Sequence, residues 1–264
     1  MKKSMAWMGL VLSVSLLAAC AGAGGGAAST PTPPVTPTPT TAPTEPAGSK
    51  FELVRCRIVD GAETGELLLA GTDSSQVYRL DVTNLAVAMD GGSSSADQLQ
   101  DGMLVEIGYN GMILETFPAQ FSGAVSVGAN TEGMEDLCGL YLQVLEDLWE
   151  VDPGLNQGIT QLGVDLSELT GLTEGEKSAL AWRFGEIHGL TPIMGTWQEL
   201  VDQGYINGKD LYWEDGCLFS ISGDATDFKA QKWASGTGAY FFNDCTATEK
   251  DGVWTYTIGT ESIS

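Results

Sequence analysis

The spacing of the apolar residues changes once in this chain, near Thr131, and that change constrains the fold more than any other feature. Between Phe51 and Val127, short apolar runs alternate with turn residues, a pattern typical of β-strands. After Thr131, apolar residues recur every three or four positions, as in an amphipathic helix. The sequence therefore predicts an all-β domain over residues 51–128, followed by an α+β domain over residues 129–264.

Five short runs in the first domain are rich in β-branched, aromatic and leucine residues and are predicted to be strands. They cover residues 51–59, 66–70, 76–82, 103–109 and 112–117. The polar Gly/Ser stretch 90–98 is predicted to be a loop. Asn110-Gly111 lies between the last two runs and favours a two-residue type I′ hairpin, which needs positive φ at both central positions. In that register Tyr109 faces Met112, Ile107 faces Leu114, and Glu106 faces Glu115.

The predicted pairing of Glu106 with Glu115 puts two like charges directly opposite each other, which destabilises a hairpin. The preferred interpretation is that Arg55, Arg57 or Arg79 bridges the two carboxylates. The alternative is that Glu106 and Glu115 form a cation site.

The run from Asp101 to Gln120, with Asn110-Gly111 at its centre and Phe117-Pro118 near its end, resembles a small domain of uncharacterised Gram-positive, clostridial-type lipoproteins. Those domains are OB-like β-barrels, similar to oligonucleotide- or oligosaccharide-binding barrels. The resemblance implies an OB-like barrel over residues 51–128 and a location outside the cell. It implies no activity, because function depends on a site and not on a fold.

The N-terminus carries a second resemblance. Lys2 and Lys3 precede an apolar run over residues 6–17, which predicts a signal peptide. Leu17-Ala18-Ala19-Cys20 resembles the lipobox of bacterial lipoproteins, which implies cleavage after residues 1–19 and a lipid on Cys20. The alternative is an ordinary signal peptide with an incidental cysteine. The lipobox implies a lipid-anchored protein on the extracytoplasmic face of the cell membrane.

Residues 20–50 are rich in Gly, Ala, Thr and Pro and have no apolar periodicity. Alternating Thr and Pro favours extended polyproline II at about 3.1 Å per residue. This segment is therefore predicted to be a tether that holds the two domains away from the membrane.

Three helices are predicted after Thr131. The first carries its apolar residues between positions 134 and 148 and ends at Asp152-Pro153-Gly154. The second and third begin at capping boxes and end near glycines. These boundaries are Thr173 with Glu176 and Gly189 for the second helix, and Thr196 with Glu199 and Gly204 for the third.

Strands are predicted at residues 216–222, around Trp233, and at 239–248 and 253–258. The last two are joined by a tight turn at Asp251-Gly252. In that register Cys245 pairs with Ile258 and Ala247 with Tyr256, while Thr246, Thr248, Thr255 and Thr257 face solvent. We expect the long helix to lie against an antiparallel sheet, in an order that resembles cystatin-like or nuclear-transport-factor-like folds.

Charge excludes one class of partner. The chain has 35 acidic and 12 basic residues, for a formal net charge of −23. Nucleic acid is held by clustered Lys and Arg, which this chain lacks, so no nucleic-acid partner is expected. The same charge disfavours contact with an anionic membrane surface, so attachment to the membrane is expected to depend on the lipid at Cys20.

The candidate chemistry is sparse, and no cofactor, metal site or catalytic residue is predicted. His188 is the single histidine and is expected in the last turn of a helix, where a cation is favourable. The cysteines after residue 20 are expected to be free thiols, or to form one pair between Cys217 and Cys245, both of which are predicted to point into the core. Acidic clusters at Glu146, Asp147 and Glu150, and at Glu214 and Asp215, are the candidates for carboxylate chemistry.

Six of the seven tryptophans lie in the second domain. Trp149 and Trp254 fall on apolar faces and are predicted to be core residues. Trp197, Trp213 and Trp233 are candidate ligand-contact aromatics, because tryptophan often marks a recognition surface, although a core role is the preferred interpretation.

The sequence therefore favours a non-catalytic binding or interaction module of the cell envelope, with a cell-wall glycan or a protein as its partner. One alternative is a hydrolase of cell-wall or glycan material that uses carboxylates of the second domain. Another is a structural spacer or assembly factor.

Overall fold

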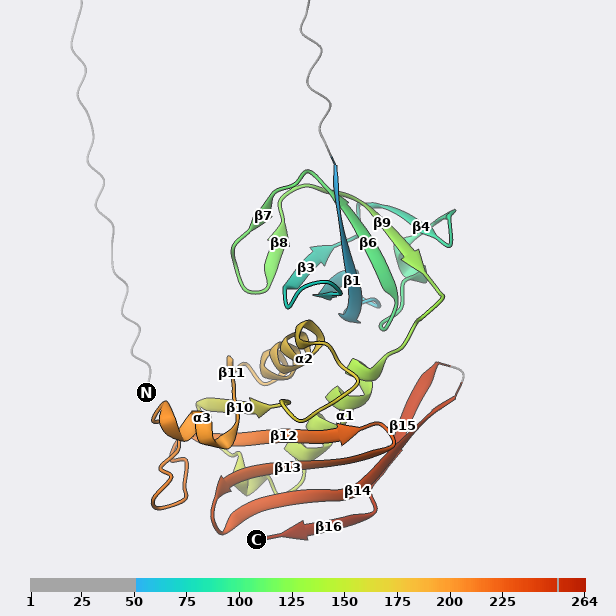
Figure 1. Cartoon of the computed structure of the whole chain (residues 1–264). Coiled ribbons are helices and arrows are strands. Elements are labelled where there is room, and N and C mark those ends of the chain that lie inside the picture. Colours follow the sequence, from blue (N-terminus) through green and yellow to red (C-terminus); the bar gives the residue numbers. More distant parts are fainter. Residues whose placement is uncertain (1–50, 251) are drawn as a thin grey trace, which may run out of the picture. The chain divides into compact units, whose positions relative to one another are not determined.

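A computed structural model describes residues 51–250 and 252–264 (Figure 1). The predicted signal peptide, Cys20 and the predicted tether lie outside the described residues. The described part of the chain is mostly β, with 45% strand and 19% helix, arranged in two sheets with few helices. The predicted mixture of strands and helices is confirmed at this level.

Residues 51–130 form a nine-stranded sheet. Its strands are β1 (Glu52–Asp60), β2 (Glu66–Gly71), β3 (Val77–Asp81), β4 (Ala86–Met89), β5 (Gly92–Ser94), β6 (Leu104–Tyr109), β7 (Ile113–Leu114), β8 (Ala119–Phe121) and β9 (Ala124–Asn130). They lie in the order β5-β4-β9-β6-β1-β2-β3-β8-β7. The predicted closed barrel is wrong, because β5 and β7 end this path and are not hydrogen-bonded to each other.

The predicted hairpin at Asn110-Gly111 is also wrong. Gly111 has a φ of 82°, but Asn110 does not have the positive φ that a type I′ turn needs. β6 pairs with β1 and β9, while the next two strands pair with each other as the separate hairpin β7–β8. The turn therefore joins two strands that are not partners. The stretch 90–98 is not a simple loop either, since it contains β5 and a 3-10 turn at Ala96–Gln98.

A second sheet of seven strands is built from the remainder of the chain. Its strands are β10 (Gln161–Asp165), β11 (Pro192–Met194), β12 (Gly216–Asp224), β13 (Asp227–Ser235), β14 (Gly238–Lys250), β15 (Val253–Thr257) and β16 (Thr260–Ile263). The order is β11-β10-β12-β13-β14-β15, and β16 pairs with β14. The antiparallel run from β12 to β15 was predicted. β10 and β11 were not predicted; β10 pairs in parallel with β12, and β11 pairs in parallel with β10.

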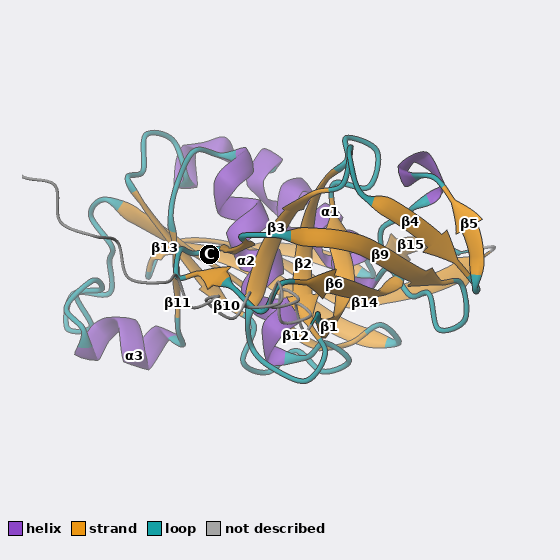
Figure 2. Cartoon of the chain, turned by 90° about the horizontal axis from the view of Figure 1, so that it is seen from above, coloured by secondary structure: helices purple, strands orange, loops and turns teal. Residues whose placement is uncertain are grey.

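All three predicted helices are present. They are α1 (Leu137–Glu150), α2 (Glu174–Ile187) and α3 (Trp197–Asp202), and a 3-10 turn at Pro153–Leu155 follows α1. Both predicted capping boxes form, at Thr173 with Glu176 and at Thr196 with Glu199. α1 and α2 contact strands of both sheets, whereas α3 lies apart from these two helices, towards β11 (Figure 2). The prediction that the long helix packs against the sheet is confirmed, because α1 packs on β13 and β15.

The β14–β15 register is confirmed in part. Ala247 pairs with Tyr256, as predicted. Cys245 and Ile258 do not form a strand pair, because β15 ends at Thr257; on the other side of β14, Cys245 pairs with Phe228 of β13. The four predicted threonines pair across the two strands and are exposed.

The three largest apolar clusters show how the sheets and helices are packed. One lies on the apolar face of the nine-stranded sheet, and another lies between the second sheet, α1 and α2. A smaller one joins Val59, Leu68 and Val77 of the first sheet to Cys138 of α1 and Ala179 of α2. These contacts hold the helices against both sheets.

Ion pairs join α2 to β1 and β3, the latter through Arg79 and Glu186. Arg57 Nε lies 2.7 Å from Glu176 Oε1, and Arg183 Nε lies 2.7 Å from Asp60 Oδ2. At the start of α2, a Cβ on Gly175 would lie 2.9 Å from a backbone oxygen of the β2–β3 turn, so only glycine permits this close approach.

Candidate binding groove

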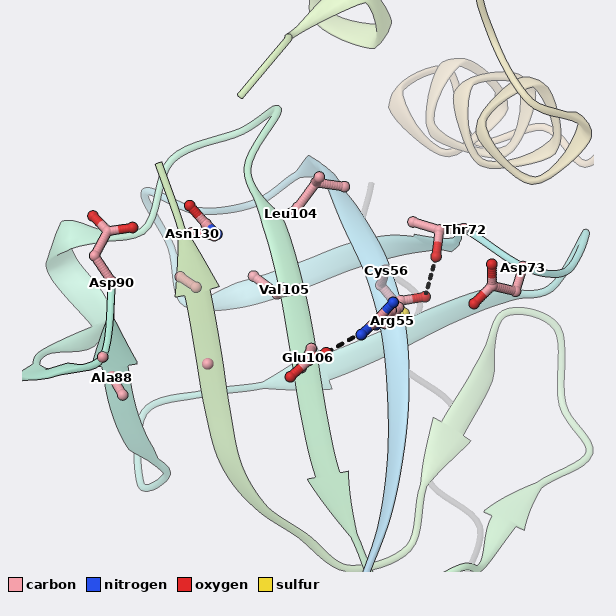
Figure 3. Close-up of a pocket in the computed structure, with 13 residues that line it drawn as sticks. Arg55, Cys56, Thr72, Asp73, Ala88, Asp90, Leu104, Val105, Glu106 and Asn130 are labelled. Carbon is pink, nitrogen blue, oxygen red and sulfur yellow. Dashed lines mark hydrogen bonds and ion pairs between the residues drawn. The ribbon is translucent and has the colours of Figure 1, made fainter. Parts of the chain in front are cut away.

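The nine-stranded sheet has one apolar face and one mixed face, because side chains alternate along each strand. On β1, Cys56 and Ile58 belong to the apolar core, whereas Arg55 and Arg57 point to the other side. α2 covers this other side over β1, β2 and β3. Over β4, β9 and β6 the same side lines an open groove of about 620 Å³ (Figure 3).

Strand register explains why a groove lies there. It places Ala88 of β4 opposite Gly128 of β9, Gly128 opposite Glu106 of β6, and Glu106 opposite Arg55 of β1. Alanine and glycine have almost no side chain, so little projects from the sheet over β4 and β9, and this leaves space above it. The groove floor is therefore small and apolar over β4 and β9 and charged over β6 and β1.

The charged half of the floor is an ion pair. Arg55 Nε lies 2.8 Å from Glu106 Oε1, and their side chains are 69% and 46% exposed. Exposed pairs of this kind contribute about 0–1 kcal/mol to stability, so a ligand can exchange with either partner at little cost. An arginine beside Glu106 was predicted and is present, but Arg55 does not bridge Glu106 to Glu115.

Each end of the groove carries an aspartate (Figure 3). Asp90 follows β4 with a φ of 49°, and its carboxylate accepts hydrogen bonds from the backbone N–H of Thr131 at 3.1 Å and its hydroxyl at 2.8 Å. Asp73 is exposed in the turn after β2. Next to it, the Thr72 hydroxyl donates to the carbonyl of Arg55 at 3.3 Å.

A smaller pocket of about 330 Å³ adjoins the groove, because Thr72 and Leu104 line both. Arg57 lines this pocket, and its guanidinium group is held by an ion pair and a hydrogen bond. Its Nε lies 2.7 Å from Glu176, and its Nη1 donates to the carbonyl of Gly102 at 2.7 Å. The Cys138 thiol also lies there, and burial raises its pKa well above the ordinary value, so the thiol stays protonated and unreactive.

The predicted pairing of Glu106 with Glu115 is wrong. Glu106 belongs to the groove floor, whereas Glu115 is exposed beyond β7 and lines a different pocket with Phe117. The two carboxylates therefore do not form the two-carboxylate cation site that was considered. Within residues 51–250 and 252–264, no group of three or more His, Cys, Asp and Glu side chains is arranged to hold a metal ion.

The three candidate aromatics do come together, but away from the groove. Trp197 and Trp233 lie edge to face with ring centroids 6.2 Å apart, and both pack against the small apolar cluster that contains Trp213. Trp213 is only 4% exposed, and its Nε1 donates to Gln161 Oε1 at 2.6 Å. α3 contributes Leu200 to the same cluster. These rings therefore help to hold α3 on the second sheet.

The other two tryptophans assigned to the core lie at its edge. Trp149 and Trp254 are partly buried and pack against the large cluster of the second sheet.

Of the candidate catalytic side chains, His188, Glu146 and Asp147 are engaged in contacts within the protein, whereas Glu150, Glu214 and Asp215 are exposed. His188 stacks on Trp149 with ring centroids 3.6 Å apart, and its Nε2 lies 3.1 Å from Glu146 Oε1. Asp147 accepts a hydrogen bond from the Tyr256 hydroxyl at 2.5 Å. His188 is therefore placed beside a carboxylate and an indole ring, at the end of α2 as predicted.

All four cysteines of the described residues are free and buried. Cys217 and Cys245 both belong to the core of the second sheet, as predicted, but β13 separates their strands. Burial raises the pKa of Cys217 to about 12 and that of Cys245 to about 11. They are unreactive core thiols.

Most residues of the groove were not predicted from the sequence. Ala88 and Gly128 attracted no attention, because β4 and β9 were not predicted and a small residue has no chemical signature of its own. The signals in the sequence were Glu106 and its candidate arginine partners, among them Arg55.

No protein-family model, curated protein or solved structure matches this chain. In the part of the chain that the structure describes, no helix has the length and apolar character to cross a membrane.

Proposed function

We propose that this chain is a lipid-anchored protein on the extracytoplasmic face of the cell membrane that binds a ligand or partner without catalysis. The observation that carries the proposal is the open groove of about 620 Å³ on the uncovered side of the nine-stranded sheet. This volume lies within the range of ligand sites in proteins. Its floor offers both apolar surface at Ala88 and Gly128 and charged groups at Arg55 and Glu106.

Placement outside the cell is supported by the N-terminal sequence. The charged start, the short apolar run and Leu17-Ala18-Ala19-Cys20 together favour lipidation of Cys20. We also propose that residues 51–128 are related to OB-like domains, and that residues 129–264 are related to cystatin-like or nuclear-transport-factor-like folds. The high strand content of the first region and the packing of α1 on an antiparallel sheet support these relationships.

The anchor is tested by metabolic labelling with a fatty-acid probe. The Cys20→Ala variant is expected to lose the label that the native chain carries. Equal labelling of both chains would refute the proposed anchor.

The binding role is tested by cross-linking on the cell surface. A photoreactive residue placed at Ala88, inside the groove, is expected to capture an envelope component. The control has the same photoreactive residue at Thr248, which is exposed on β14 and lies outside the groove. Capture that is equal at the two positions, or absent at Ala88, would argue against the groove as the binding site.

A further inference from the structure

The charges around the groove indicate which kind of ligand it accepts. Arg55 is neutralised by Glu106, so the floor contributes no net charge. The two ends contribute Asp73 and Asp90, and among the described residues neither takes part in an ion pair with a Lys, Arg or His side chain. The groove is therefore net negative and complementary to a ligand with positive charge at both ends.

The length of the groove sets the size of that ligand. Asp90 follows β4 and Asp73 follows β2, and these strands are four steps apart in the order β4-β9-β6-β1-β2. At about 4.8 Å per step, β4 and β2 are separated by about 19 Å along the sheet, and this sets the approximate span between their two aspartates. An extended peptide of about six residues spans this distance at about 3.3 Å per residue.

The groove lining also bears on the class of ligand. None of the described residues that line the groove is aromatic, so it offers no platform on which a sugar ring could stack. It does offer hydrogen-bonding groups for a peptide, from Thr72 and Asn130, beside the low apolar floor. These features favour a peptide over a glycan.

We propose that the groove over β4, β9, β6 and β1 binds an extended basic peptide segment of about six residues, with Lys or Arg side chains that reach Asp73 and Asp90. This inference rests on the proposed binding function and assigns the ligand class of the same groove.

A substitution at Gly128 tests directly whether the ligand occupies the groove. A Cβ at this position has as its nearest neighbour a backbone oxygen at 3.9 Å, which is ordinary contact, and Gly128 is not among the glycines with positive φ. Gly128→Leu therefore fills the groove without backbone strain. A second variant, Asp73→Asn with Asp90→Asn, removes both end charges and leaves the groove open.

The matched control is Asp202→Asn with Asp215→Asn. It makes the same change of charge at two exposed aspartates that do not line the groove. Circular dichroism and melting temperature establish that each variant is folded.

The assay is fluorescence anisotropy of the full chain with a dye-labelled six-residue peptide that has lysine at both ends and alanine and serine between. Gly128→Leu is expected to weaken binding at least tenfold. The double groove variant is expected to weaken it about tenfold, whereas the control is expected to change it by less than twofold. Binding is also expected to weaken as salt rises, because exposed charges are screened.

A peptide with glutamine in place of both lysines is expected to bind at least tenfold more weakly. Equal binding of the two peptides would refute the assigned charge, and unchanged binding by Gly128→Leu would refute the location. Groove-dependent binding of spermine without binding of the lysine peptide would show that the cation is a polyamine and would overturn the peptide assignment. If the lysine peptide does not bind but cross-linking from Ala88 captures an envelope component, the proposed binding function is supported and only the assigned ligand class is refuted.

Discussion

Asp101 is a carboxylate whose ionisation opposes folding. It lies in the turn before β6, and its Oδ1 accepts a hydrogen bond from the backbone N–H of Ala62 at 3.1 Å. Burial is the main cause that raises its pKa from 3.8 to about 6, and the neighbouring charges of Asp60, Asp136 and Glu63 act in the same direction. We predict that Asp101→Asn stabilises the protein at neutral pH, because the amide keeps the acceptor oxygen and carries no charge.

The magnitude follows from the two pKa values. A change from 3.8 to about 6 corresponds to about 3 kcal/mol, at 1.36 kcal/mol per pKa unit. Asp101 is only partly buried, so solvent screens part of this energy and we expect a gain of about 1–2 kcal/mol. Because the folded-state pKa is raised, the contribution of Asp101 to stability is fully present below about pH 3.8. It is lost as pH rises through about 6.

The assay is urea unfolding of the native chain and of Asp101→Asn at several pH values between 4 and 8. The gain in unfolding free energy is expected to be largest at pH 7–8 and to fall toward zero at pH 4. Asp81→Asn is a matched control with the opposite expectation, because hydrogen bonds from the Thr83 side chain and backbone lower the pKa of Asp81. A gain that is independent of pH, or a loss of stability at pH 7.5, would refute this account of Asp101.

Two further predictions concern buried groups of the second sheet and its helices. Lys232 is fully buried and donates to Asn156 Oδ1 at 2.7 Å and to backbone carbonyls at the end of α1, so Lys232→Met leaves buried acceptors without a donor. We expect the free energy of unfolding, measured in urea, to fall by about 2 kcal/mol, and to change negligibly in the exposed control Lys229→Met. Equal effects of the two substitutions would contradict the structural role of Lys232. The buried cysteines should react with a thiol reagent at pH 8 only after unfolding, because burial raises the pKa of each thiol; fast labelling of the native chain would disprove this. These residues are Cys56, Cys138, Cys217 and Cys245.

Helix boundaries could be predicted because they depend on residues that are close in sequence. Thr173 and Glu176 are three positions apart and cap the same turn whatever the rest of the chain does. The predicted hairpin at Asn110-Gly111 was wrong because strand pairing depends on residues that are far apart in sequence. Strand pairing is non-local, and β6 pairs with β1 and β9, which start about 50 residues before and 20 residues after it.

The parallel strands β10 and β11 were also beyond the reach of local patterns. They are short, and they pair only because the intervening α2 returns the chain to the same end of the sheet. The candidate tryptophans illustrate the same limit. Their residue type suggested either a ligand surface or a core, and the packing of α3 on the second sheet placed Trp213 in a core.

The sequence by itself determined the strand-rich first region, the ends of the three helices and the acidic character of the chain, because composition and local spacing specify these properties. Only the tertiary structure decided that the first sheet stays open and that α2 covers one part of its mixed face. The groove follows from that choice, since Arg55, Ala88, Glu106 and Gly128 lie on four different strands. Their proximity depends on strand register, and no local pattern in the chain encodes the register between distant strands.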